Sequence, residues 1–562
     1  MRAEQDRSKI VAALATCSSF NDGKIHVKVN EGSTVWGGKG ADKAKHARTA
    51  TRNMPLILQK VFEKELNSPL SSTVVLDLSV LESDDSDAGA MSINATSLAL
   101  YSTVFQGQSP VGGVHVAILG DEVVVSPSTK QMAEASMNMI YAGRKGSPLY
   151  FHACGKASLQ NTVAALRVAD LEASRIAESI AEYIKENRKE REFELRTPED
   201  LVALVRIRDF VDRDVDALLG SQNFTISEFN LELSALKSKC TDYFRKIGAF
   251  RSPVVKIPGS GCVTTDEVDL AFEQSVKAAV TERILSKGSR IDGRSYDATR
   301  QMFLQPERSG LCAISAGGTK LISTVKCTAA KTRQTFECTS NLAISSAPSF
   351  LRERRRHLKA LEYDLIQVGL GSNLSVEKAL FAAIPDYAEF PFSIKLKCQA
   401  LSMDGSFPML SVCASSIALA NAGVPMDTHV AGLSVGILNQ EEGDPIVILD
   451  PVDLEEHLVD GLIMLTSAES GMVTSASLEG VKSKISIEKL IQSLERAQEK
   501  MKDTLTDMGE VCPLESNPHQ GSFFEKVTIP KEAKGKLIGP GGRNIRQIEA
   551  LTVRLSYLIL HK

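Results

Sequence analysis

Residues 90–119 read AMSINATSLALYSTVFQGQSPVGGVHVAIL, and residues 409–438 read MLSVCASSIALANAGVPMDTHVAGLSVGIL. The two stretches align without a gap, which places Ser97 opposite Ser416 and Gly113 opposite Gly432. Each stretch predicts a helix of small residues, a loop with a proline and then an apolar strand. Small residues at helical spacing let a helix lie close against a sheet, and a glycine before a strand permits a close backbone approach. Coincidence between two apolar segments is the alternative, but an ungapped match over several features favours a duplicated α/β unit.

The bulk composition limits the class of protein. A chain of 562 residues is too long for one hydrophobic core and predicts several domains. Its net charge is −4, so any nucleic-acid binding has to come from local basic patches. Ten cysteines without a Cys-x-x-Cys pair argue against a zinc ribbon or a disulfide scaffold and fit a reducing compartment. No apolar run approaches about 18 residues, so we expect no membrane span, and the start MRAEQDRSKI is not typical of a secretory signal.

Helical and linker signals divide the rest of the chain. Apolar residues between about 161 and 250 follow a period of about 3.6, which predicts a helical region. The stretches RSPVVKIPGSGC at 251–262 and GEVCPLESNPHQGS at 509–522 are typical of linkers. We therefore expect a first α/β unit at 1–155, a helical domain at 156–252, a linker and helix at 253–281, a second α/β unit at 282–508, a linker at 509–524 and a C-terminal segment at 525–562.

The C-terminal segment contains KGKLIGPGGRNIRQIEA at 534–550. Its G-x-x-G glycines, Gly539 and Gly542, join two predicted helices, which is the pattern of a KH domain. Glycines let backbone amides approach RNA phosphates, and the next helix adds the positive end of its dipole. The predicted RNA-binding residues of this loop are Lys536, Gly539, Gly541, Gly542, Arg543 and Arg546, with Lys534 nearby. An ordinary glycine turn is the alternative. Twenty residues follow Gly542, fewer than a complete KH domain requires, so we expect a partial one.

A second motif, SKGSRIDGRSYDATR at 286–300, precedes the second copy. Together with the duplicated stretches and IGPGGRNIR, it makes nearly the whole chain resemble the polynucleotide phosphorylase family, which consists of phosphorolytic 3′-to-5′ exoribonucleases. The resemblance implies an α+β fold class, with two RNase PH-like domains, an all-α domain between them and a C-terminal KH-like segment. It also implies RNA as a partner, a homotrimer or a larger ribonucleoprotein complex, and no membrane. The location it implies is the mitochondrial matrix or a plastid, or a bacterial cytoplasm.

The resemblance also implies a catalytic site in the second copy. Asp450 and Glu456 align with metal-binding carboxylates that would hold Mg²⁺, Asp460 aligns with a further acidic position, and Ser406 aligns with the phosphate-binding stretch. Several aligned positions depart from the family pattern. They are Leu454 and Leu462 in place of acids, Phe407 and Pro408 in place of serines, and Leu365 and Ile366 in place of paired arginines. Phosphorolysis must hold two anions together, so the loss of guanidinium groups predicts a weak or absent site.

The basic run LRERRRHLK at 351–359 is the remaining candidate for RNA contact, through Arg354 and Arg355; its alternative is a solvated surface. We expect an RNA-binding protein of polynucleotide phosphorylase architecture that has a weakened or lost phosphorolytic site and acts as a scaffold. One rival is an active enzyme that uses Mg²⁺ at Asp450 and Glu456, with Asp460 and Ser406. The other is a scaffold that binds only proteins.

Overall fold

The structure is a computed structural model of the full chain. It describes residues 10–17, 25–30, 57–62, 65, 74–82, 88–105, 108–187, 214–215, 217–218, 226–246, 265–287, 290–307, 310–329, 336–341, 371–385, 390, 392–440, 443–514 and 530–552. Within these ranges no helix is both long enough and apolar enough to cross a membrane.

An eight-stranded sheet forms the centre of the molecule and contains strands from both copies. Its order is β14-β13-β15-β16-β7-β6-β4-β5. The first copy supplies β4 (Gly112–Leu119), β5 (Glu122–Val125), β6 (Met137–Arg144) and β7 (Ser147–Ser158). The second copy supplies β13 (Val430–Leu438), β14 (Ile446–Leu449), β15 (Gly461–Ala468) and β16 (Met472–Glu479). Read outward from the middle, the two halves have the same strand order, as expected for a duplication.

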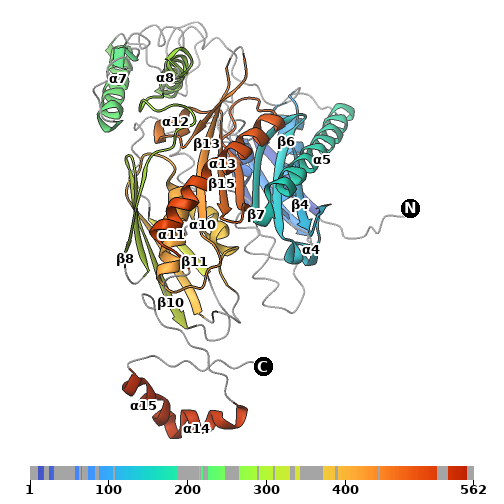
Figure 1. Ribbon diagram of the computed structural model, residues 1–562. Helices are drawn as coiled ribbons and strands as arrows, with labels where there is room; N and C mark the ends of the chain where they lie inside the picture. The colour runs from blue at the N-terminus through green and yellow to red at the C-terminus, as the bar shows by residue number, and fades with distance from the viewer. Residues whose placement is uncertain are drawn as a thin grey trace.

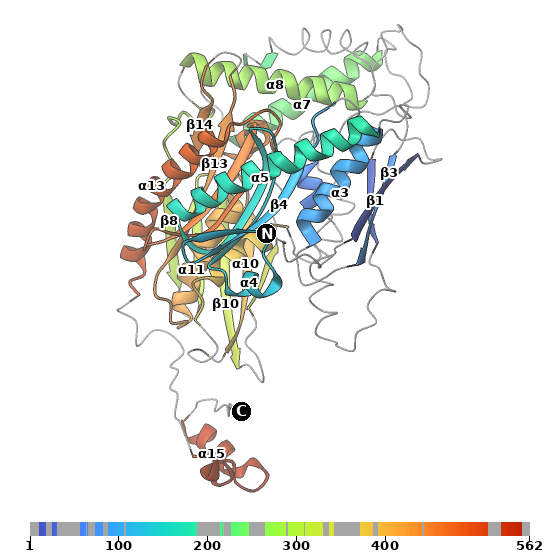
Figure 2. The ribbon, with the colours of Figure 1, turned by 90° about the vertical axis from the view of Figure 1, so that its right-hand side faces the viewer.

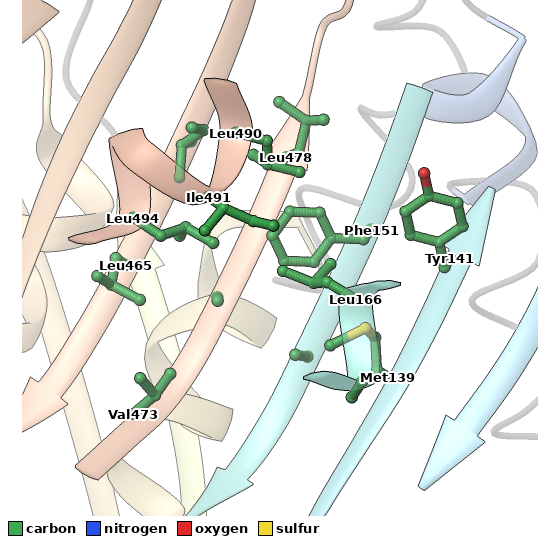
Figure 3. Close-up of a cluster of buried hydrophobic side chains, with 14 of the residues drawn as sticks. Met139, Tyr141, Phe151, Leu166, Leu465, Val473, Leu478, Leu490, Ile491 and Leu494 are labelled. Carbon is green, nitrogen blue, oxygen red and sulfur yellow. The ribbon is translucent and has the colours of Figure 1, made fainter. Parts of the chain in front are cut away.

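The two halves meet where β16 pairs with β7. The pairing is antiparallel and runs from Met472 opposite Ser158 to Leu478 opposite Phe151. Two long helices cover one face of the sheet, namely α5 (Leu159–Glu186) and α13 (Ile487–Val511) (Figure 1). Their apolar faces and both half-sheets form one continuous core, in which Phe151, Leu166, Leu478 and Ile491 lie close together (Figure 3). The copies are therefore joined by backbone pairing and by a shared hydrophobic core.

The other face of the large sheet carries a second layer of helices. It consists of α3 (Ala88–Thr103), α10 (Gly371–Phe381) and α11 (Phe407–Asn421). Two smaller sheets pack on the far side of these helices, and Figure 2 shows α3 between β4 and the strands β1 and β3. α11 is buried along nearly its whole length because it lies between two sheets. The fold is therefore built of four layers, in agreement with the predicted α+β class.

The smaller sheets also repeat each other. One contains β1 (Ile10–Cys17), β2 (Ile25–Asn30) and β3 (Val74–Glu82) in the order β1-β3-β2. The other has the order β11-β12-β10-β9-β8, from β8 (Met302–Glu307), β9 (Leu311–Ala316), β10 (Thr319–Ala329), β11 (Phe336–Asn341) and β12 (Phe392–Ser402). β3 in the first of these sheets and β12 in the second each pair antiparallel with one neighbour and parallel with the other. Among the described residues, the first copy has no strands corresponding to β8 and β9.

The repeat extends to individual hydrogen bonds. The hydroxyl of Ser97 accepts from the backbone N–H of Val111 at 2.8 Å, and Ser416 accepts from Val430 at 3.0 Å. Both pairs are fourteen residues apart. Gly113 and Gly432 face their helices so closely that an added Cβ would lie 2.8 Å from Ile93 or 3.0 Å from the Met409 sulfur. The alignment of the two stretches therefore predicted equivalent positions correctly.

The helical part differs from the prediction at one boundary. α7 (Ile226–Lys246) and α8 (Thr265–Lys287) form a helical pair that packs near β14, through a cluster that includes Phe272 and Ile448. α5 lies within the predicted helical domain at 156–252, but it buries Ala165, Leu166 and Ala169 against the central sheet. The helical period identifies the helix but not the surface it covers, so a boundary at 156 separates α5 from its own sheet.

The C-terminal helices are drawn apart from the layered body in both ribbon views. After η2 (Lys531–Ala533), α14 (Lys534–Ile538) leads through η3 (Pro540–Gly542) into α15 (Arg543–Thr552). The predicted helix–glycine loop–helix arrangement is present.

Candidate functional site: the start of α11 and the KH loop

The residues before α11 have a backbone that only a few residue types adopt. Gly405 has φ 79°, and a Cβ there would lie 2.5 Å from the carbonyl oxygen of Pro451. Ser406 follows with φ 55°, and Asp450 on the adjacent segment has φ 50°. Such left-handed conformations are uncommon outside glycine and are found often at functional sites. This turn holds the Ser406 side chain and its N–H against Asp450 and Glu456.

Both hydrogen-bond donors of Ser406 point at carboxylates of the chain itself. Its hydroxyl donates to Asp450 Oδ1 at 2.8 Å, and its backbone N–H donates to Glu456 Oε1 at 2.7 Å. The N-terminus of a helix attracts anions because its amides are unpaired and its dipole is positive there. In this structure the carboxylate of Glu456 accepts that N–H, at the position where the resemblance implies a phosphate.

Asp450 is buried and bound by two arginines. Arg300 Nη2 donates to Oδ1 at 2.6 Å, and its Nε and backbone N donate to Oδ2 at 2.8 and 2.9 Å. Arg294 Nη1 adds a longer contact to Oδ2 at 3.3 Å. Burial alone would raise the pKa of Asp450, but the hydrogen bonds and charge of Arg300 outweigh it and hold that pKa well below its usual range. Asp450 is therefore an anion whose oxygens already have five donors.

The motif at 286–300 supplies this arrangement. Arg290 is fully buried and pairs with Glu455, which is also buried. Its Nη1 and Nη2 donate to the carbonyl oxygens of Leu449 and Asp450 at 2.7 and 2.9 Å. Arg290, Arg294 and Arg300 therefore all bind the residues at the end of β14. The arginines of this motif bind Asp450 and the backbone beside it, so the motif has a structural role here.

Asp460 has a separate set of partners. Lys277 of α8 donates to its Oδ1 at 2.7 Å, and the backbone N–H of Asn439 donates to its Oδ2 at 2.8 Å. Asp460 is 4% exposed, so this pair links α8 to the end of β13 in a buried environment. In this geometry its carboxylate ties the helical part to the sheet.

The three predicted acids do not form a cradle for Mg²⁺ in this structure. Magnesium requires several oxygen ligands, carboxylates among them, in near-octahedral geometry. Here Asp450 faces guanidinium groups, Asp460 faces an ammonium group and Glu456 accepts from a helix N-terminus. Across the described part of the chain, no three His, Cys, Asp or Glu side chains gather as a metal site. The donor set present fits buried ion pairs better than a metal.

Two of the departures from the family pattern, Phe407 and Leu454, are packed into hydrophobic cores, whereas Pro408 and Leu462 are half-buried. Phe407 is 2% exposed in the core between α11 and the five-stranded sheet, and Leu454 is 1% exposed in the cluster around α8. Both side chains have apolar neighbours, which explains why hydroxyl or carboxylate groups are absent there. Leu365, Ile366 and the predicted RNA-binding residues Arg354 and Arg355 lie outside the described residues.

In the first copy, Ser126 occupies the position that corresponds to Asp450. Ser126 has φ 54° and donates its N–H to the carbonyl of His115 at 2.8 Å. Asp450 makes the same bond to Ser434, and His115 and Ser434 are equivalent in the aligned stretches. Ser126 is thus the structural counterpart of Asp450, and the first copy lacks the acid. A sequence alignment alone missed this pair because the loop before it differs in length.

Arg300 and Lys277 are the functional-site residues that the sequence reasoning did not identify. Arg300 is at the end of the quoted motif, and Lys277 is one of several lysines on an amphipathic helix. Three arginines within eleven residues, at 290, 294 and 300, were the feature of the sequence that could have predicted a common carboxylate partner.

The KH loop presents its glycines and cations outward. Gly539, Gly541 and Gly542 all have positive φ, of 68°, 58° and 77°. A Cβ on Gly539 would lie 2.5 Å from the Asn544 side chain, whereas one on Gly541 would meet nothing within 4 Å. The open side of the loop is therefore at Gly541.

Two side-chain hydrogen bonds to backbone carbonyl groups hold the conformation of the loop, and they do not neutralise its positive charges. Asn544 Nδ2 donates to the carbonyl of Lys536 at 2.8 Å, and Arg546 Nη2 donates to the carbonyl of Gly541 at 2.9 Å. Lys536, Arg543 and Arg546 are exposed, and no described carboxylate pairs with them. The phosphate backbone of RNA is bound by cationic side chains and by backbone amides that it can approach closely.

Comparisons with known proteins agree with this architecture. The family description "3′ exoribonuclease family, domain 1", or RNase PH, matches residues 294–425, and "KH domain" matches residues 524–555. A polyribonucleotide nucleotidyltransferase of Thermomicrobium roseum is 27% identical over 84% of this chain and 60% of its own length. The mitochondrial polyribonucleotide nucleotidyltransferase 2 of Arabidopsis thaliana is 26% identical over 85% of this chain and 49% of its own. The chain thus spans less than two thirds of either relative.

A solved structure titled "Archaeal exosome core" also matches, with 15% identity, a TM-score of 0.34 and coverage of 43% of this chain and 98% of that chain.

The duplicated sheet, the matched RNase PH region and the glycine loop define an α+β protein of the RNase PH class with a KH module. Relatives that align with most of this chain are named polyribonucleotide nucleotidyltransferase. These findings support a divergent member of the polynucleotide phosphorylase family.

Proposed function

We propose that this protein binds RNA through a polynucleotide phosphorylase scaffold and does not carry out phosphorolysis. The observation that carries the proposal is the arrangement around Ser406. Its hydroxyl and its N–H both donate to carboxylates of the chain, and Asp450 is fully engaged by Arg300 and Arg294. A phosphate at this position would have to displace these bonds and would face two anionic carboxylates.

Charge repulsion is the physical reason for the loss. Phosphorolysis places inorganic phosphate beside a phosphodiester, so cations and a metal must offset their repulsion. The described cations near the site are already neutralised by Asp450 and Glu455. Adding an anion there without further cations is unfavourable. Mg²⁺ would be a cofactor only of the active alternative, where it would polarise the phosphate oxygens.

RNA binding is assigned to the KH loop. The supporting features are the exposed cations Lys536, Arg543 and Arg546 and the open backbone at Gly541. Arg354 and Arg355 remain predicted further contacts. A role within a ribonucleoprotein assembly, a homotrimeric core and a mitochondrial or plastid location belong to the same proposal by family likeness.

One assay tests the loss of phosphorolysis. The purified chain is incubated with a 5′-labelled oligoribonucleotide, Mg²⁺ and inorganic phosphate, with an active polyribonucleotide nucleotidyltransferase as the positive control. We expect no phosphate-dependent shortening and no release of nucleoside diphosphates.

The rival outcome has a distinct signature. Release of nucleoside diphosphates that requires phosphate and is lost in Glu456→Gln would establish an active enzyme and overturn the proposal. Glu456→Gln suits this control because the amide oxygen can still accept from the N–H of Ser406, so the variant changes charge and not shape.

A further inference from the structure

The outer face of the five-stranded sheet is open to solvent. The inner face of this sheet packs against α11, and Figure 1 shows β8 and β10 at the outside of the molecule. Along β12 the side chains alternate, so that Ile394 and Leu396 are buried whereas Lys395 and Lys397 are exposed. This alternation is typical of a sheet that has one face in the core and the other in water. The outer face is therefore accessible to a partner.

The register of the strands places four lysines near one another on this face. They lie on the adjacent strands β10 and β12 and are Lys320, Lys326, Lys395 and Lys397. Lys326 is directly opposite Lys395, and Lys397 is opposite Thr324, one diagonal step from Lys326. Residues in such diagonal positions are about 7–8 Å apart. Like charges directly opposite each other destabilise a sheet, so the stability of the sheet does not explain this arrangement.

Three of these lysines are available to a ligand. Within the described part of the chain, no carboxylate or other acceptor contacts Lys320, Lys326 or Lys397. The fourth lysine interacts within the chain and is not counted as an available cation. The acidic residues in the strands of this sheet are Glu307 and Glu337, and they belong to the two outermost strands, β8 and β11. Positive charge therefore follows the inner strands of the face, which we call the lysine strip.

The spacing of the three cations favours a polyanion over a single small ion. Lys320 and Lys326 are six residues apart on one strand, which is about 20 Å at a rise of about 3.3 Å per residue. Side chains of a strand stand roughly perpendicular to the sheet, so these ammonium groups do not converge on one point. A chain of phosphates can contact them one after another, whereas one phosphate ion cannot.

An exposed aromatic ring lies beside the lysine strip. Phe303 of β8 is 56% exposed. It is directly opposite Ser315 of β9, which is in turn opposite Lys320 of β10, so the three residues form one row across the sheet. Because neighbouring strands are about 4.8 Å apart, Phe303 and Lys320 are separated by about 10 Å. Every nucleobase has a face that can stack on such a ring, and an acidic polypeptide has no base, so the ring favours RNA as the polyanion.

We propose that the lysine strip binds the phosphate backbone of single-stranded RNA while a base stacks on Phe303. The inference rests on the proposed RNA binding and adds to the KH loop a second contact site, on the layered body of the protein. Its contacts are to phosphates and to the face of a base, so we expect little dependence on the RNA sequence.

The first test uses the full chain with Lys320, Lys326 and Lys397 all changed to Gln. Binding of a single-stranded oligoribonucleotide is measured by fluorescence anisotropy across a series of salt concentrations. We expect weaker binding and a salt slope reduced in magnitude by about 2.1, since each lost phosphate contact on a single strand contributes about 0.7. The wild-type slope should persist in a control with the same three changes at exposed lysines outside this sheet, namely Lys130, Lys239 and Lys502.

Thermal unfolding separates a loss of RNA contacts from a folding defect. The triple Gln variant removes a like-charge contact from the sheet, so it should unfold at the wild-type temperature or above it. A clearly lower unfolding temperature would give these lysines a structural role and contradict the proposal.

Phe303→Ala tests the stacking contact. Loss of the ring should weaken RNA binding about 5- to 150-fold and leave the salt slope unchanged, because no cation is removed. The control is Phe381→Ala, whose ring is 66% exposed on α10, outside this sheet. Unchanged RNA affinity in Phe303→Ala would overturn the stacking contact.

An acidic polypeptide is the competing partner, and polyglutamate serves as its probe in the same assay. If the triple Gln variant loses polyglutamate binding but keeps its RNA affinity and slope, the face binds an acidic protein and the RNA assignment is wrong. If the binding of neither probe changes, the proposal is overturned.

Failure of the wider RNA proposal gives a different result. The wild-type chain would then show no salt-dependent RNA binding at all. Failure of the lysine strip alone instead leaves wild-type RNA binding intact, sensitive to Gly541→Asp in the KH loop and insensitive to the three lysine changes.

Discussion

At the scale of single residues, the Asp450–Arg300 pair decides what the second-copy site can do. Both side chains are less than one tenth exposed, and the pair is bidentate. A buried pair of this kind is costly to break because the remaining partner is left as an uncompensated charge. The same bonds that stabilise the turn remove Asp450 from the set of available metal ligands.

We predict that Asp450→Asn lowers the free energy of unfolding by about 3–5 kcal/mol at pH 7, because Arg300 stays buried without an anion. The folded pKa of Asp450 is depressed, so its contribution is fully present above its unfolded pKa, near 3.9, and is lost as pH falls towards the folded value. Urea unfolding from pH 7 down to pH 3 should show the stability difference between the two proteins beginning to shrink below about pH 4.

Asp444→Asn is the control, since Asp444 is exposed. It should unfold like the wild type at every pH. Equal stability of wild type and Asp450→Asn at pH 7 would contradict the structural role.

The KH loop offers a second single-residue test. Gly541 has φ 58° and open space around its Cβ position, a conformation that Asn and Asp also tolerate. Gly541→Asp should therefore fold but weaken RNA binding through its negative charge, with Gly542→Asp acting in the same direction. Gly541→Asn has nearly the same shape without the charge and should retain much more affinity. Fluorescence anisotropy with one oligoribonucleotide compares the RNA affinities of the three variants. Unchanged affinity in both Asp variants would contradict the assignment of RNA binding to the KH loop.

At the scale of elements, the sequence predicted what depends on local pattern. The small-residue helices, the strands that follow them and the glycine loop were predictable because each is encoded within about thirty contiguous residues. The partners of Asp450 were not predictable from the sequence. Arg300 lies 150 residues away, and the pairing depends on how the turn before α11 folds. The sheet that α5 covers could not be predicted for a related reason, since a helical period does not identify the neighbouring layer.

The close approach of α11 to β13 gives an element-scale prediction. A Cβ on Gly432 would lie 3.1 Å from the Met409 backbone, and both elements are buried. Gly432→Ala should therefore destabilise the protein by about 1–3 kcal/mol through overpacking. Gly509→Ala lies within α13 and meets nothing closer than 4.0 Å, so it should be neutral or stabilise by up to about 1 kcal/mol. Thermal unfolding of both variants checks this. An unchanged stability of Gly432→Ala would show that α11 and β13 can move apart to accommodate the added methyl group.

At the scale of the whole molecule, the seam between β7 and β16 makes the two copies one structural unit. Backbone pairing, the shared core and the Lys60–Glu479 ion pair all cross it. A catalytic site can be lost in such a molecule while the fold persists, because the residues that join the copies are different from those around Ser406.

The last prediction concerns this seam. Phe151 is fully buried beside Leu166, Leu478 and Ile491 (Figure 3). Phe151→Ala should cost about 3–5 kcal/mol. Because the core is continuous, hydrogen exchange should accelerate in β13 and β15 of the second copy as well as in β4 and β6. The control is Phe381→Ala, whose ring is 66% exposed and should change stability by about 0.5 kcal/mol or less. Faster exchange confined to the first copy would show that the halves unfold independently, and the shared sheet would then be an association of two domains and not a single cooperative core.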